Sequence, residues 1–358
     1  MSTLFIIGNG FDVNCGINTK YRDVYRGYVK ANSHTSNLQK FKDTISSDIE
    51  NWGDFEMAMA KYAETLESEE EFLECIRDFS EYMEDYLLHE MIVFKKNIEN
   101  ENIFDVIIKE MQNSFASFYD DISHNVSSIM RKRNAGQISK ISAISFNYTD
   151  AFDIFLKECF KRSKLLSNSV IHIHGILQDA PVLGVDNSEQ LKIDYNLTRK
   201  GKRNFIKPVF NTEYDYERVE HAKYMIDRAL TICSFGWSLG ESDLTWRNEI
   251  LSWLRKDEVH HLFIYDYSIS QVTYRTKGEM LDIEDDAKGR LLSKWGINAD
   301  DYIYNQIHIP CGKNIFNIKS VIDSEMIKLK DKEKKMFEEK LKKSREFVEK
   351  QLSNTAMV

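Results

Sequence analysis

The chain has 358 residues, 42% of them hydrophobic, which is enough to fill the core of one large α/β domain with an insertion, or of two domains. Its formal net charge of −9 disfavours a dedicated nucleic-acid-binding protein, because such proteins usually present a basic face. No apolar run approaches the roughly 20 residues of a membrane span, no signal peptide precedes the first strand, and the scattered cysteines lack the spacing of a zinc site. We therefore expect a cytoplasmic protein with no membrane segment and no metal.

The first predicted element is a buried strand over residues 3–7, an apolar run that ends in a glycine turn. The turn contains Gly8, Asn9, Gly10 and Asp12, and Gly16 follows. Glycines lack a Cβ, so the backbone N–H groups of such a turn can approach a pyrophosphate, and the N-terminus of a following helix favours an anion. The spacing G-x-G-x5-G differs from the dinucleotide-binding fingerprint G-x-G-x-x-G. A nucleotide-binding turn is the first hypothesis, and a strand-to-helix turn without a ligand is the alternative.

A large helical insertion is predicted between the first and second strands. The pattern indicates a helix over residues 21–29, a loop over 31–39, and then a helical region from about 38 to 135. In that region apolar residues recur every three to four positions, as on the buried face of a helix. Acidic residues concentrate at 65–90; a solvated face is the simplest interpretation, and a partner-binding surface is the alternative.

From residue 141 onward, predicted strands alternate with predicted helices. The strands lie at 141–146, 169–174, 181–185, 229–235, 262–267 and 304–309, and the helices at 150–160, 216–228, 243–254 and 287–295. Such alternation gives right-handed crossovers between parallel strands. The sequence therefore predicts a Rossmann-like α/β domain over residues 1–317, with a mostly parallel sheet and helices on both faces.

A long amphipathic helix is predicted for the C-terminal residues 318–358. Its apolar stripe, set among many lysines and glutamates, consists of Ile318, Ile322, Met326, Leu329, Met336, Leu341, Val348 and Leu352. The helix either packs back on the domain or joins a second copy into a homo-oligomer, because a helix of this length rarely finds cover on one domain.

Polar residues follow four of the predicted strands, and in an open parallel sheet ligands bind outside the carboxyl ends of the strands. Asn147 could hold a water or a ribose hydroxyl, or cap the next helix. His174 is a candidate general base, whereas His172 is expected to be buried and hydrogen-bonded. We predict Asn147 and His174 as catalytic residues, and a nucleotide-binding set of Gly8, Asn9, Gly10, Asp12, Asp150, Gly236, Ser238 and Asp243. For Asp150, a place in the first turn of the following helix is the alternative. For Gly236 and Ser238, the alternative is a turn in which Ser242 or Asp243 caps the next helix.

These segments together resemble AbiH-type abortive-infection proteins of bacterial phage defence. The resemblance rests on FIIGNGFD at 5–12, WGDFE at 52–56, FNYTD at 146–150, HIHG at 172–175, LGVD at 183–186 and GWSL at 236–239, and it covers about residues 3–270. The order of motifs is also similar, more distantly, to sirtuin-like NAD-consuming domains, which implies an NAD site. In that resemblance Asn147 and His174 match the catalytic pair, while Gly8, Gly10 and Ser238 match cofactor contacts. A zinc-binding cysteine quartet is absent from the sequence, so a protein deacetylase has little support.

The resemblance implies an anti-phage effector that hydrolyses NAD to nicotinamide and ADP-ribose. Asn147 would orient a water or the ribose, and His174 would accept a proton. One alternative is a non-catalytic nucleotide sensor whose output is the insertion or the C-terminal helix. Another is a Mg²⁺-dependent nuclease or nucleotide hydrolase that uses Asp12, Asp150 and Asp243. A phage or host partner is expected as the trigger.

Overall fold

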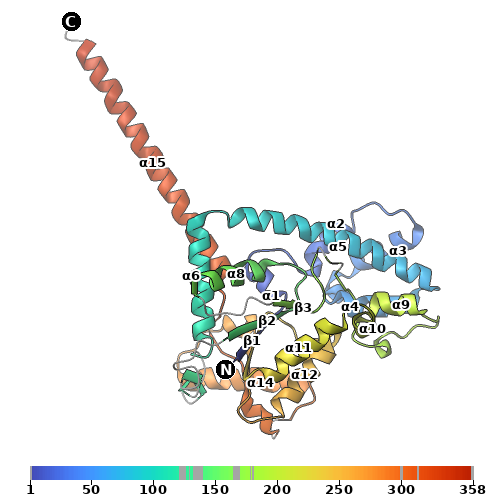
Figure 1. Ribbon diagram of the computed structural model, residues 1–358. Coiled ribbons are helices and arrows are strands. Elements are labelled where there is room, and N and C mark those ends of the chain that lie inside the picture. The colour runs from blue at the N-terminus through green and yellow to red at the C-terminus, as the bar shows by residue number, and fades with distance from the viewer. Residues whose placement is uncertain are drawn as a thin grey trace.

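The parallel sheet predicted from the sequence is present. The computed structural model describes residues 2–120, 126–128, 130–131, 140–163, 170–177, 179, 181–298, 301–312 and 314–355. Within these ranges six parallel strands form one sheet in the order β3-β2-β1-β4-β5-β6 (Figure 1). They are β1 (Ser2–Ile7), β2 (Lys140–Ser145), β3 (Val170–His172), β4 (Thr231–Phe235), β5 (His261–Tyr265) and β6 (Ile307–His308). The Rossmann-like fold class is therefore confirmed.

Two hydrophobic cores lie on opposite faces of this sheet, because successive side chains of a strand point to opposite sides. Phe5 and Ile7 of β1 belong to one core, and Leu4 and Ile6 belong to the other. The first core is completed by α1 (Gly10–Asn14), α6 (Glu101–Ser117), α8 (Ala151–Ser163) and the start of α15 (Ile318–Thr355). The second is completed by α11 (Tyr216–Arg228), α12 (Leu244–Leu254) and α14 (Lys277–Lys294). Helices cover both faces, as predicted.

The predicted helical insertion lies between β1 and β2. It follows α2 (Tyr21–Tyr28), which the sequence predicted separately, and includes α3 (Ser36–Ser47), α4 (Phe55–Tyr62) and α5 (Glu69–Asn97), which leads into α6. The predicted loop over 31–39 ends earlier than expected, because the Thr35 side chain accepts a hydrogen bond from the Leu38 N–H and so starts α3 at Ser36. Residues 121–125, 129 and 132–135 of the insertion lie outside the described residues.

Other element boundaries also differ from the prediction. The segment 181–185 is not a sheet strand; it makes one isolated bridge, between Val185 and Ile206. Its apolar side chains are buried against the first core, which explains the strand-like pattern. Helix α14 begins ten residues before the predicted 287. The sequence pattern did not reveal α9 (Arg199–Phe205), α10 (Lys207–Tyr214) or α13 (Tyr267–Ser270).

Two further features bear on the class of protein. No helix in the described ranges is long and apolar enough to cross a membrane. All five cysteines are buried, and none forms a disulfide within the described chain.

Candidate functional site

The site is organised by the switch point of the sheet, between β1 and β4. From β1 the chain continues to β2 on one side, and β3 returns to β4 on the other, so the loops at these carboxyl ends diverge and leave a crevice. Two cavities open there. The first cavity, about 620 Å³, lies on the β2 and β3 side, and the second cavity, about 870 Å³, lies on the β4 and β5 side. Five residues line both: Asn9, Lys20, Gly236, Trp237 and Ser238.

The glycines of the first turn bring it into contact with the turn after β4. The Gly8 N–H donates to the Phe235 carbonyl over 2.9 Å, and the Gly10 N–H donates to the Gly236 carbonyl over 2.8 Å. A Cβ on Gly10 would lie 2.5 Å from the Gly236 Cα. The glycines therefore let the turns after β1 and β4 touch, and these two N–H groups are already used within the chain.

A buried carboxyl group holds the predicted catalytic amide. Asp12 of α1 accepts a hydrogen bond from Asn147 Nδ2 over 2.9 Å and one from the Thr149 hydroxyl over 2.8 Å. Burial raises the pKa of Asp12 to about 7, although both hydrogen bonds lower it. Because Nδ2 must face Asp12, Oδ1 of Asn147 is the atom left for a ligand, and it has no hydrogen-bond partner among the described residues.

A second buried carboxyl group holds the predicted catalytic imidazole. Oδ1 of Asp243 lies 3.0 Å from His174 Nε2 and 3.0 Å from Lys207 Nζ, and Oδ2 accepts from the Trp237 indole over 3.1 Å. Burial disfavours the Asp243 charge, but Lys207 and His174 outweigh it and hold the pKa of Asp243 below its ordinary value. An ionised carboxylate can only accept, so the proton of the neutral His174 ring is on Nε2.

The free atom of His174 is therefore Nδ1, which carries a lone pair and has no partner within the described chain. Burial and the nearby charge of Lys207 lower the pKa of His174, so the ring is neutral at pH 7. His174 and Asn147 line the same cavity together with Gly8, Asp12 and Asp243. The first cavity thus brings a neutral base and an oriented amide to one place.

Among the residues of this cavity that the sequence analysis missed, two are charged and buried, Lys207 and Glu56. Lys207, at the start of α10, donates to the Ser242 carbonyl over 2.9 Å, and its Nζ lies 4.0 Å from Glu56 Oε1. Burial raises the pKa of Glu56 to about 7, against the effect of Lys207. Glu56 also accepts a hydrogen bond from the Tyr21 hydroxyl over 2.9 Å. The WGDFE run was a usable signal for Glu56, whereas nothing in the sequence around Lys207 marks a buried lysine.

Two of the singled-out residues lie elsewhere. Asp150 pairs with Lys95 over 3.1 Å and lines neither cavity. His172 lies 3.0 Å from the Asn147 carbonyl through Nδ1 and 2.9 Å from Asp153 through Nε2, so the expectation that it is hydrogen-bonded is confirmed, whereas its side chain is only partly buried. The remaining predicted residues, Asn9, Gly10, Gly236 and Ser238, line one or both cavities.

Fold and site together define a Rossmann-like α/β protein with a buried polar crevice at the switch point of its sheet. Comparison with protein families then places the chain more narrowly. Residues 4–265 match the model described as "Bacteriophage abortive infection AbiH", and the chain belongs to this family. The family predicted from the sequence is thereby confirmed, and with it a role in abortive infection. A search of curated proteins finds no match, and the likeness to sirtuin-like domains stays a prediction.

Proposed function

We propose that this AbiH protein hydrolyses NAD to nicotinamide and ADP-ribose in the first cavity. One observation carries the proposal. Asn147 and His174 line one cavity, and their Oδ1 and Nδ1 atoms are buried with no hydrogen-bond partner among the described residues. Buried polar atoms are normally paired, so an unpaired amide oxygen and an unpaired imidazole nitrogen in one cavity indicate a polar ligand.

The reaction needs one base and one orienting group. Water adds across the bond between the ribose C1′ and the nicotinamide nitrogen. The bond breaks with its electron pair on the ring nitrogen, which loses its positive charge. The water oxygen bonds to C1′, and its proton passes to His174 Nδ1 and then to solvent. Asn147 Oδ1 accepts a hydrogen bond from the water or a ribose hydroxyl, and Asp12 keeps the amide in that orientation.

The direct test incubates the purified chain with NAD and measures nicotinamide by chromatography. His174→Ala removes the base and is expected to lower the turnover by about 100-fold or more. His221→Ala is the matched control, because His221 is exposed on α11 and lines neither cavity. Equal turnover by His174→Ala, with the same unfolding temperature as the wild type, would remove histidine from the mechanism.

A measurement in cells tests the proposal even if the enzyme is active only during phage infection. Bacteria that carry the wild-type chain are expected to lose NAD after phage infection, whereas bacteria that carry His174→Ala keep it. Protection from phage without any fall in NAD would contradict the proposal.

A nucleotide sensor is the second candidate function, and a specific observation favours it. The second cavity is lined in part by Asn314 and Asn317 and by Lys319, Ser320 and Asp323 at the start of α15, so a ligand there contacts the base of the long helix. Tight binding of NAD in a calorimeter, with no product in cells or in vitro, would select this function.

A Mg²⁺-dependent hydrolase has less support. Its three carboxylates have separate partners: Asp12 with Asn147 and Thr149, Asp150 with Lys95, and Asp243 with Lys207, His174 and Trp237. No group of three or more His, Cys, Asp or Glu in the described ranges is placed to hold a metal ion. Sensitivity of NAD cleavage to EDTA would revive this alternative.

A further inference from the structure

We propose that the second cavity binds the adenosine half of the same dinucleotide, with Tyr267 stacking on the base. This inference rests on the proposed function, because it concerns the half of NAD that does not occupy the first cavity. The two cavities adjoin at the switch point and share a border of five residues. A ligand made of two nucleotides can therefore place one half on each side of the β1 and β4 turns.

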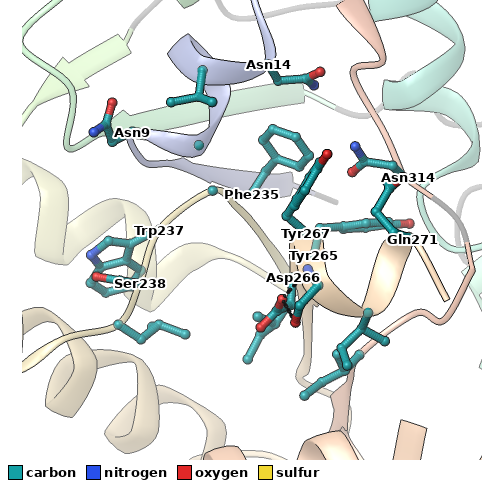
Figure 2. Close-up of a pocket in the computed structure, with 18 of the residues that line it drawn as sticks. Asn9, Asn14, Phe235, Trp237, Ser238, Tyr265, Asp266, Tyr267, Gln271 and Asn314 are labelled. Atoms are coloured by element: carbon teal, nitrogen blue, oxygen red, sulfur yellow. Dashed lines mark hydrogen bonds between the residues drawn. The ribbon is translucent and has the colours of Figure 1, made fainter. Parts of the chain in front are cut away.

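The second cavity has the composition of a nucleoside site. Its apolar lining includes Phe235, Ile264, Ile269 and Leu291. Polar side chains also line it. Figure 2 shows Asn9 and Ser238 on one side of the cavity and, on the other side, Asp266 and Tyr267, which directly follow β5, and Gln271 at the end of α13. Ligand sites typically combine an apolar lining with a few polar groups that fix orientation.

Tyr267 is the residue that indicates binding of a nucleobase. It directly follows the Asp266 cap at the start of α13, lines the second cavity, and is 75% exposed. An aromatic ring in this position offers a face on which a nucleobase can stack. Beside it, Asp266 uses Oδ1 to accept from the Ser268 N–H over 2.7 Å, so its second carboxylate oxygen can accept from a ribose hydroxyl.

The pyrophosphate would then cross the border between the cavities. Lys20 lines both cavities, is exposed, and has no ion pair within the described chain, so its charge is available to a phosphate. Ser238 lines both cavities as well and can donate a hydroxyl. Lys20 and Ser238 replace the Gly8 and Gly10 N–H groups, which are engaged with the turn after β4.

The test compares substrates with and without the adenosine half. Tyr267→Ala is expected to raise KM for NAD by roughly 5- to 150-fold, the value of one base stacked on an aromatic ring. The same change should leave kcat/KM for nicotinamide mononucleotide, which has no adenosine, unchanged. Tyr267→Phe keeps the ring and should restore the wild-type KM. Tyr224→Ala is the matched control, because Tyr224 is 61% exposed on α11 and lines neither cavity.

A binding measurement separates this inference from the proposed function. Calorimetry with ADP-ribose and with AMP needs no catalysis. Tyr267→Ala should weaken the affinity of the chain for both ligands by the same factor. Tyr267-dependent binding without NAD cleavage would support the second cavity and reject the proposed function. Cleavage of NAD and nicotinamide mononucleotide with equal kcat/KM, or ADP-ribose binding that ignores Tyr267→Ala, would reject the inference and leave NAD cleavage standing.

Discussion

Asp12 shows how one buried residue ties stability to the site. Its pKa in the folded chain is about 7 against an ordinary value of 3.8, mainly because burial disfavours the charge. A raised pKa on an acid means that the folded state keeps its proton while the unfolded state loses it. The contribution of Asp12 to stability is therefore best below about pH 4, and falls as the pH rises to about 7.

Asp12→Asn should abolish this decline. An amide at this position can still accept from Asn147, and the Thr149 hydroxyl can turn to accept from it. Relative to the wild type, the free energy of unfolding of Asp12→Asn is expected to rise by up to about 4 kcal/mol between pH 4 and pH 8, from the shift of about three pKa units. Urea denaturation at several pH values measures it. Asp194→Asn, at an exposed position, is the control, and parallel curves for Asp12→Asn and the wild type would contradict the assignment.

The sequence indicated much of this site, because residues that directly follow a strand can be located from the strand itself. Asn147, His174, Gly236 and Ser238 were found in this way, and the structure brings them to the crevice. Lys207 reaches the crevice from a helix that the pattern did not reveal. The prediction that Asp150 lies at the crevice failed for a different reason. Asp150 lies only three residues after Asn147, but its side chain pairs with Lys95 of α5, and this contact depends on tertiary structure.

At the scale of elements, the contact between the turns after β1 and β4 should be intolerant of a side chain. A Cβ on Gly10 would lie 2.5 Å from the backbone of Gly236, so Gly10→Ala must push the two turns apart. We expect it to lower the free energy of unfolding by on the order of 3 kcal/mol and to disturb the border of both cavities. Gly289→Ala is the matched control within α14, because a Cβ there meets no described atom within 4 Å.

The control should shift stability in the opposite direction. In a helix interior alanine loses less backbone entropy than glycine, so Gly289→Ala is expected to add about 0.5–1 kcal/mol. Thermal unfolding measured by circular dichroism distinguishes the two variants. If Gly10→Ala left the free energy of unfolding unchanged, the two turns would be shown to separate without loss of stability.

The type of an element was predictable where the residue composition and the spacing of apolar residues indicate the same structure. Strands β1, β4 and β5 are examples, since their side chains are almost all buried. The pattern was misleading where burial occurs without pairing, as at 181–185. It gave no sign of α9, which is short and polar: its start is fixed by Thr198, whose hydroxyl accepts from the Lys200 N–H over 3.2 Å. Such a cap is a local contact, and the spacing of apolar residues along the sequence gives no information about it.

At the scale of the whole molecule, α15 is anchored at its base and projects away from the body (Figure 1). Phe316, just before the helix, is fully buried with a φ of 56° and packs its ring 5.7 Å from that of Phe11. The Asn14 side chain donates to the Phe316 carbonyl. The base of α15 is therefore joined directly to α1, the helix that carries Asp12.

The projecting part of α15 should join two copies of the chain. Among the side chains that the structure describes, Leu329 is the last on α15 to pack against the first core, whereas Ile327 is 61% exposed and Met336 is 50% exposed. At 1.5 Å per residue the segment beyond Leu329 extends about 40 Å, and a helix of this length in water is stabilised chiefly by packing of its apolar face. The apolar stripe continues along that segment in the sequence through Leu341, Val348 and Leu352.

We therefore expect the full chain to be a dimer in sedimentation at micromolar concentration, and a chain that ends at Lys330 to be a monomer with the same unfolding temperature, because the anchor around Phe316 is retained. Met336→Glu places a charge on the stripe without shortening the helix and should weaken the dimer in the same direction. Identical sedimentation of all three chains would show that α15 does not pair two copies, and its apolar face would then be left for the phage or host partner expected as the trigger.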